Sequence, residues 1–103
     1  MPKPHHPLSD VRNLLKRKMY TINAPALQDA RNDFGWGESD ILAAIGKLRD
    51  MHCYCAGDPH HAIDGAFVDK FRARALHLGE DVYLKYYVNP NNGFLIINSC
   101  KKI

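Results

Sequence analysis

The sequence predicts one α+β domain, in which three N-terminal helices pack on one face of a mostly antiparallel β-sheet that ends in a hairpin. Apolar residues recur at helical spacing in the first half of the chain, up to about Leu48. Past Arg49 they alternate with polar residues, which is the period of a β-strand. A chain of 103 residues has room for a single domain, residues 1–103, and helices followed by strands are typical of the α+β class.

The first helix is expected to begin near Ser9 or Asp10, because either side chain can cap a helix N-terminus. Leu8 and Val11 begin its apolar stripe. Residues 19–22 then form a short strand candidate.

Two more helices follow. Asn23 is expected to cap the second helix, which the segment Gly35-Trp36-Gly37 ends. Ser39 is expected to cap the third helix. The apolar positions of the third helix lie on one face: Ile41, Leu42, Ile45 and Leu48.

The second half of the chain predicts four strands. Residues 51–55 are the first candidate, and residues 56–61 form a loop by composition. Residues 67–76 form the next strand, which ends in a turn at residues 77–80. The last two strands form a hairpin around the turn-forming residues 89–93.

Alternation along the hairpin gives it two chemically different faces. One face of its first strand is apolar: Val82, Leu84, Tyr86 and Val88. The other face is polar: Tyr83, Lys85 and Tyr87. If Val88 pairs with Phe94, Ser99 lies opposite Tyr83 and Lys101 is its diagonal neighbour. A phenol beside ammonium groups can hold a phosphate and move a proton.

The strand before the hairpin is basic on one side. Lys70, Arg72 and Arg74 occupy alternate positions, so with Lys102 they are candidate RNA-binding residues. The other side of this strand is apolar: Phe71, Ala73 and Ala75. With Lys85 on the next strand, the basic face extends across several strands. The solvated side of an ordinary amphipathic strand has the same pattern, and this alternative stays open.

Composition limits the function classes. The net charge of +3 and the isoelectric point near 8.8 are compatible with an acidic partner such as RNA. No apolar run approaches the roughly 18 residues that span a bilayer, so no membrane partner is expected. The N-terminus does not resemble a signal peptide, and three cysteines argue against a disulfide framework, so the cytoplasm is the expected location. No cofactor or metal motif is present.

Both ends of the chain resemble the MqsR family of toxins from bacterial toxin–antitoxin pairs. Residues 82–85, Val-Tyr-Leu-Lys, followed by a hairpin and residues 95–102, resemble the end of that family. Residues 4–11 resemble its opening Pro-His-x-x-Leu-x-x-Val, and the order of elements between also fits. The resemblance implies a RelE-like fold and a metal-independent endoribonuclease, an mRNA interferase that cleaves messenger RNA and inhibits translation and growth. It also implies a cognate antitoxin as partner, and it leaves a requirement for the ribosome open.

The family's functional residues carry over only in part. Its catalytic tyrosine falls on Tyr83, and its C-terminal lysine falls on Lys101. The family's Phe-Tyr-Lys-Ser stretch corresponds here to residues 52–56, His-Cys-Tyr-Cys-Ala, which contain no lysine. Where a glutamine precedes Asp-Val-Tyr in the family, this chain has Val68.

Cleavage of RNA by its own 2′-hydroxyl needs a base, an acid and cations that stabilise the phosphorane. Tyr83 is expected to make an acid–base or phosphate contact, with its pKa lowered by nearby cations. Lys85 and Lys101 are expected to stabilise the phosphorane. His60 is the candidate catalytic substitute for the unmatched positions, because histidine titrates near neutrality. Two other histidines are open to the same role: His52 and His61.

Two other classes of function remain open. A RelE-like module without catalysis would act by binding RNA or antitoxin alone, which the unmatched positions favour. A small zinc-binding protein would use Cys53 and Cys55, which share a face of a regular strand, with His60 or His61. The cysteine spacing is not a usual zinc pattern, and small buried cysteines explain it more simply.

Overall fold

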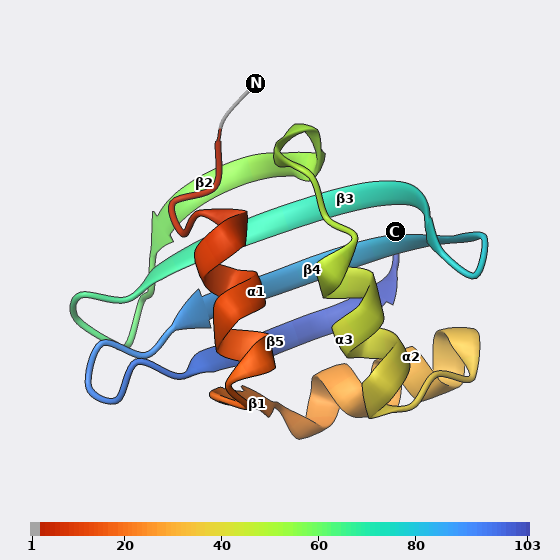
Figure 1. Cartoon of the computed structure of the whole chain (residues 1–103), viewed down its shortest axis with the longest axis horizontal. Helices are drawn as coiled ribbons and strands as arrows, with labels where there is room; N and C mark the ends of the chain where they lie inside the picture. Colours follow the sequence, from red (N-terminus) through yellow and green to blue (C-terminus); the bar gives the residue numbers. More distant parts are fainter. Residues whose placement is uncertain (1–2) are drawn as a thin grey trace.

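The computed structural model describes residues 3–103, which form three α-helices and a five-stranded sheet (Figure 1). The elements follow one another as α1 (Leu8–Lys16), β1 (Tyr20–Ile22), α2 (Ala24–Phe34), α3 (Glu38–Gly46), the 3-10 helix η1 (Asp50–His52), β2 (Cys53–Pro59), β3 (Phe67–His77), β4 (Glu80–Val88) and β5 (Leu95–Lys102). The predicted α+β class is confirmed. No helix within the described residues is long and apolar enough to cross a membrane.

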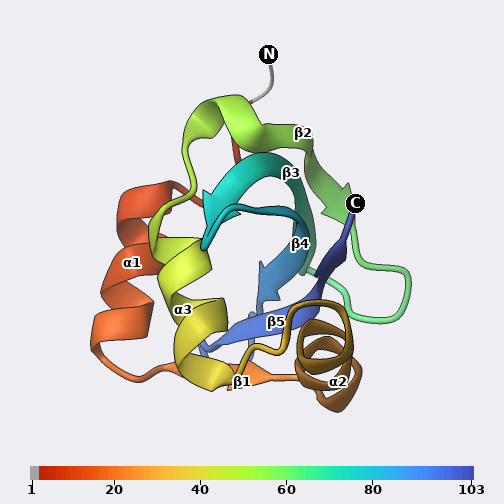
Figure 2. The same cartoon turned by 90° about the vertical axis from the view of Figure 1, so that its right-hand side faces the viewer.

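The strands form one mixed sheet in the order β1-β5-β4-β3-β2. β1 runs parallel to β5, and the other neighbouring strands are antiparallel. The sheet curves around α1 and α3, which cover its inner face (Figure 2). The core between them contains large, fully buried side chains: Ile41, Ile45, Phe71, Leu84 and Tyr86. We call the other side of β3, β4 and β5 the open face, because neither α1 nor α3 covers it.

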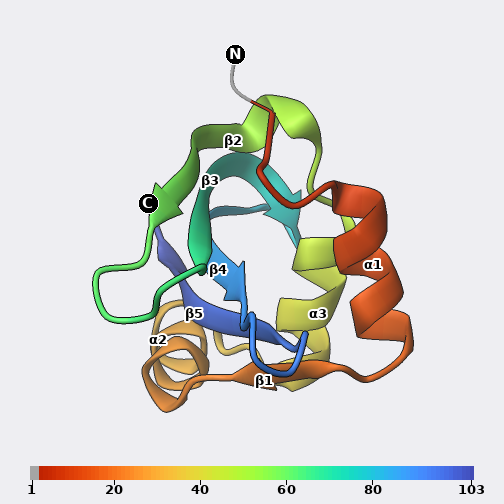
Figure 3. The same cartoon turned by 90° about the vertical axis from the view of Figure 1, so that its left-hand side faces the viewer.

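The expectation that all three helices pack on one face needs a correction, because α2 lies along β5 at the side of the sheet (Figure 3). β1 pairs with only Leu95–Ile97 of β5, so the rest of this strand needs another cover. α2 provides it, since a carboxylate oxygen of Asp33 accepts a hydrogen bond from the Lys102 N–H at 3.0 Å. Ala26 and Ala30 of α2 are fully buried against the main core.

Two predicted helix caps are wrong, because α1 and α3 begin earlier than expected. Pro7 and Gly37 occupy the N-cap positions. The predicted caps lie within the first turns instead: Ser9, Asp10 and Ser39. Proline has no N–H to satisfy, and the Asp40 carboxylate accepts the Gly37 N–H at 3.3 Å. These arrangements replace the side-chain caps that were expected from Ser9 or Asp10 and from Ser39.

The first predicted strand and loop of the second half are also shifted along the chain. Residues 50–52 form η1 rather than a strand, and β2 continues to Pro59 through most of the expected loop. A β-bulge at Tyr54 interrupts its pairing with β3, since Cys53 pairs with Phe71 whereas Cys55 pairs with Lys70. Cys53 therefore faces the core and Cys55 faces the side of Lys70, so the two thiols do not share a face.

The predicted alternation of β3 holds up to Ala73, which is buried, and fails at Ala75, which is exposed. The pairing with β4 is irregular here, and the Ala75 N–H donates to the Asp81 carboxylate at 2.8 Å. β3 and β4 extend into the expected turn, which shrinks to Leu78-Gly79. Both residues have positive φ, as tight hairpin turns require.

The register of the final hairpin differs from the prediction. Val88 pairs with Leu95 rather than with Phe94. An extra residue, Asn98, then forms a β-bulge in β5 between the partners of Tyr86 and Lys85. Its side-chain oxygen accepts a hydrogen bond from Nδ2 of Asn23 at 2.9 Å. Asn23 thus precedes α2 as predicted, but its side chain holds the bulge instead of capping the helix.

This bulge reverses which alternate residues of β5 face the core. Leu95 and Ile97 are buried before it, and Cys100 is buried after it. Lys101 consequently lies on the open face and pairs directly with Tyr83, the position expected for Ser99.

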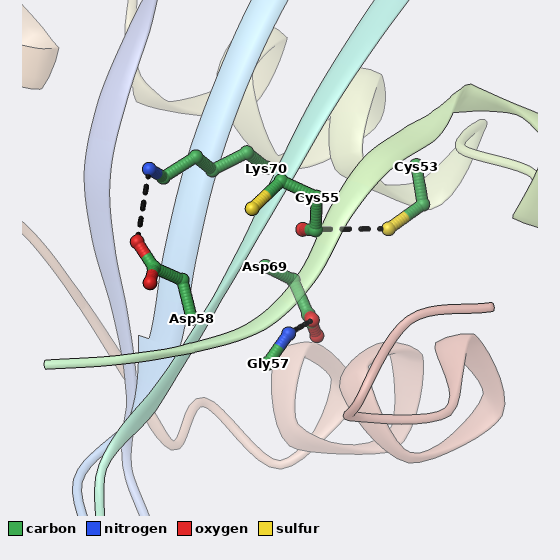
Figure 4. Close-up of polar contacts among 6 residues, drawn as sticks. All are labelled: Cys53, Cys55, Gly57, Asp58, Asp69 and Lys70. Carbon is green, nitrogen blue, oxygen red and sulfur yellow. Dashed lines mark hydrogen bonds and ion pairs between the residues drawn. The ribbon is translucent and has the colours of Figure 1, made fainter. Parts of the chain in front are cut away.

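A buried carboxylate connects three segments that are distant in sequence. Asp69 in β3 is fully buried on the inner side of the sheet, opposite to the direction of its neighbour Lys70 (Figure 4). Its oxygens accept hydrogen bonds from the backbone N–H groups of His5 and His6 at 2.9 Å and of Gly57 at 3.0 Å. Gly57 has a φ of +64°, and a Cβ there would lie 3.2 Å from the His5 ring. Asp69 thereby fixes both the N-terminal segment and β2 to β3.

We expect Asp69→Asn to lower the free energy of unfolding by roughly 2–3 kcal/mol, because an amide cannot accept three buried N–H groups as a carboxylate does. Urea denaturation measures the change. Asp58→Asn is the matched control: Asp58 is half exposed and pairs with Lys70 at 3.1 Å, so its loss should cost at most about 1 kcal/mol. Equal losses for the two variants would contradict this account of Asp69.

Candidate nucleic-acid interface

The open face carries two parallel rows of polar side chains across β3, β4 and β5. The first row is Arg72, Tyr83 and Lys101, which are directly paired across the three strands. The second row is Lys70, Lys85 and Ser99, two residues along each strand. The sequence therefore located this face correctly, since all these side chains come from alternate strand positions.

A shallow pocket of about 330 Å³ lies around Tyr83, and we call it the Tyr83 pocket. It is lined by Tyr54, Arg72, Tyr83, Lys85, Ser99, Lys101, Lys102 and Ile103. Five of the eight residues predicted for the site therefore meet here.

Tyr54 is a member of this pocket that the sequence analysis did not assign. The guanidinium carbon of Arg72 lies 4.1 Å from the centre of the Tyr54 ring, in a cation–π contact. The Tyr54 and Tyr83 ring centres are 6.3 Å apart. Nζ of Lys101 lies 5.7 Å from the centre of the Tyr83 ring. The sequence did not indicate Tyr54 because its position depends on the bulge in β2, which regular strand alternation does not predict.

The pKa of Tyr83 moves in the direction opposite to the expected one. Burial first, and the neighbouring phenol of Tyr54 second, raise the pKa of the Tyr83 phenol to about 12, although Arg72 acts to lower it. The cations of the pocket therefore do not make Tyr83 a base. At neutral pH the phenol keeps its proton and can act as a hydrogen-bond donor or an acid.

Two of the predicted cations are already paired. Nζ of Lys70 lies 3.1 Å from the Asp58 carboxylate, and this contact is the first cause of its raised pKa. Arg74 lies outside the Tyr83 pocket, where its exposed side chain is 3.3 Å from the Asp81 carboxylate. Exposed ion pairs are weak, so both side chains can change partners at low cost.

His60 lies in a second pocket next to the first. This His60 pocket, about 130 Å³, is lined by Asp58, Pro59, His60, His61, Val68, Lys70, Lys85 and Asn98. Lys85 lines both pockets. Nδ1 of His60 lies 3.0 and 3.1 Å from the backbone N–H groups of Ala62 and Ile63, and accepts from them. A neutral His60 therefore carries its proton on Nε2, which makes that nitrogen a donor.

Val68, where the resemblance to the MqsR family would place a glutamine, is apolar and covered. Val68 is buried in a small cluster with Ala66 and Tyr87, and Ile63 of the β2–β3 loop packs on it. His52, the other open histidine, lies in η1, where Nδ1 accepts the Arg49 N–H at 2.9 Å. Burial lowers the pKa of His52, with Arg49 as the second cause.

The residues proposed for zinc do not come together. Burial raises the pKa of the Cys53 thiol to about 11, with the charge of Asp69 as the second cause. Within residues 3–103, no group of three or more His, Cys, Asp or Glu side chains could hold a metal ion. Cys53 behaves as a small core residue, which was the simpler interpretation of the sequence.

The open face can bind and neutralise a phosphate. Arg72, Lys85 and Lys101 supply positive charge around one pocket, and Tyr83 supplies a proton. Among the described residues, no histidine, aspartate or glutamate side chain lines this pocket, so it offers acids and cations without an evident base.

The fold and this face define a small α+β protein with a basic, uncovered sheet surface. No protein-family model matches the chain, and no curated protein matches it either. The resemblance to the MqsR toxins is therefore one of short sequence motifs alone.

We expect the Tyr83 phenol to titrate near pH 12 rather than near pH 10, because it is buried beside another phenol. Tyrosine ring NMR signals followed against pH measure this. Tyr54→Phe should lower the pKa of Tyr83, and Arg72→Ala should raise it, since the Tyr54 phenol and the guanidinium act in opposite directions. Titration of Tyr83 below pH 10 would show that the cations dominate after all.

Proposed function

We propose that this protein is a RelE-like toxin of a bacterial toxin–antitoxin pair, and that it cleaves messenger RNA without a metal ion. The main support is the row of Arg72, Tyr83 and Lys101 with Lys85 in the same pocket. Tyr83 and Lys101 are the two residues that match the family's catalytic positions. Their direct pairing across β4 and β5 is the arrangement that a shared site needs.

In the proposed reaction hydroxide takes the proton of the 2′-hydroxyl group, the 2′ oxygen attacks the adjacent phosphorus, and the bond to the 5′ oxygen breaks. The products are a 2′,3′-cyclic phosphate and a 5′-hydroxyl end. Lys85 and Lys101 stabilise the extra negative charge on the phosphorane. The Tyr83 phenol, protonated at neutral pH, donates its proton to the departing 5′ oxygen. Arg72, Lys70 and Lys102 contact neighbouring phosphates.

The proposed antitoxin covers the open face with acidic side chains. Exposed cations on this face give the protein a surface that neutral or basic partners would not match. A partner that occupies the Tyr83 pocket would block RNA directly.

A second candidate function is favoured by the lack of a base. A RelE-like module that binds RNA or antitoxin without cutting RNA needs the cations and not the proton transfer. The Tyr83 pocket has no histidine or carboxylate side chain among its lining residues, and such a module would tolerate this.

Cleavage decides between the two. Purified protein should cut a defined single-stranded RNA in the presence of EDTA and leave 2′,3′-cyclic phosphate and 5′-hydroxyl ends. Tyr83→Phe and Lys101→Ala should each lower the rate about a hundredfold, because each removes one group that acts in the transition state. Lys16→Ala, at the exposed end of α1, is the control and should retain full activity. If folded wild-type protein leaves both free RNA and RNA on translating ribosomes intact, the nuclease proposal fails.

The pH dependence of cleavage identifies the base. If hydroxide removes the 2′ proton, the rate should rise about tenfold per pH unit from about pH 6 to about pH 9, since Tyr83 stays protonated throughout. If His60 is the base, the rise should end in a plateau, as in general-base catalysis by a side chain. His60→Gln would then remove the plateau. We expect the continuous rise, because the Nε2 of neutral His60 already carries a proton.

A further inference from the structure

The open face has two aromatic platforms, one at each pocket, with Lys85 between them. Tyr54 lines the Tyr83 pocket, and His60 and His61 line the His60 pocket. Lys85 lines both pockets, so a ligand that fills them together must pass its ammonium group. The bond cleavage proposed above takes place in the first pocket.

The Tyr54 platform is held from one side. Arg72 lies 4.1 Å from the ring centre, while 39% of the residue remains exposed to solvent. Contact with the guanidinium group holds one face of the Tyr54 ring in place, and the opposite face can stack on a nucleic-acid base. Stacking of this kind is tolerant of base identity, because every base has a π-face.

The histidine platform is built in the same way from different residues. The rings of His60 and His61 are stacked, with centres 5.1 Å apart and planes inclined by 13°. His60 is fixed by the backbone N–H groups of Ala62 and Ile63, and its ring meets Tyr87 at 4.9 Å between centres. His61 is the exposed outer ring of this stack.

The spacing of the platforms is set by β4. Tyr83 supports the first platform and Tyr87 the second, and these residues are four positions apart on one strand. At about 3.3 Å per residue, they are about 13 Å apart, with Lys85 midway. Two bases that are splayed apart rather than stacked on each other, as in single-stranded RNA bound to proteins, fit such a span.

We infer that the open face holds one dinucleotide step of single-stranded RNA, with one base on Tyr54, the next on His61, and the phosphate between them at Lys85. This inference rests on the proposed function only for the identity of the ligand as RNA. It adds two base sites and a minimum ligand length, and neither depends on cleavage.

The test is NMR titration with 2′-O-methyl ApA, which cannot be cleaved through its own 2′ oxygen, and with AMP for comparison. The dinucleotide should shift signals at both platforms and bind at least about tenfold more tightly than AMP, because only the dinucleotide fills both base sites. Equal affinities for ApA and AMP would overturn the inference.

Paired variants at each platform separate stacking from charge and from folding. Tyr54→Leu and His61→Leu should each weaken ApA binding about fivefold or more, because they remove the ring and keep apolar bulk. Tyr54→Phe and His61→Phe keep a ring and should bind within about twofold of wild type. Both residues are exposed, so all four variants should remain folded. Unchanged binding by both Leu variants would mean that only the cations hold the ligand, which contradicts the inference.

This outcome is independent of the nuclease assay. Cleavage of RNA with no difference between the Leu and Phe variants would leave the nuclease and remove the two base sites. Ring-dependent binding of ApA without any cleavage would keep the base sites and support the binding module in place of the nuclease.

Discussion

The arrangement of the open face depends on a carboxylate that lies on the other side of the sheet. Asp69 accepts three backbone hydrogen bonds, and through them β2 and the N-terminal segment are fixed to β3. Burial of the Asp69 carboxylate with fewer N–H donors would cost free energy, so we expect β2, β3 and the N-terminal segment to become ordered together. Because side chains alternate along β3, fixing Asp69 inward also fixes Lys70 outward. β2 then brings its bulge, and Tyr54 with it, next to Arg72.

Local charge pairing divides the cations of the open face into two groups. Lys70 and Arg74 each have an acidic neighbour within 3.3 Å, at Asp58 and Asp81. Lys85 and Lys101 have no acidic side chain within ion-pairing distance in the described part of the chain. The cations that lack partners are those nearest Tyr83. The unpaired cations repel one another in the absence of an anion, so their positive charge favours the binding of an anionic ligand more than it favours folding.

The sequence was sufficient where regular periods apply and insufficient where a single residue breaks them. Alternation placed Arg72, Tyr83 and Lys85 on one face correctly, because β3 and β4 are regular around these positions. It failed for Ala75, Cys55 and the partner of Tyr83, since each follows or lies within an irregularity. Bulges depend on tertiary contacts, such as the hydrogen bond from Asn23 to Asn98, which join residues far apart in the chain. The predicted cap of α3 failed for a different, local reason: the Asp40 carboxylate inside the helix accepts the N–H of Gly37, so the helix begins before Ser39.

Because of the Asn98 bulge, the site depends on how the residues of β5 pair with β4 as well as on which residues they are. Every side chain of β5 beyond it is assigned to its side of the sheet by one extra residue. If Asn98 paired regularly instead of bulging, the two sides of the second half of β5 would be exchanged, so that a lysine would enter the core and a cysteine would face the ligand. Two residues added to the turn at Asn91 would change neither side. Related chains that keep this surface are therefore expected to vary in length at the turn, and in the last strand either to keep the bulge or to lack one residue at its position.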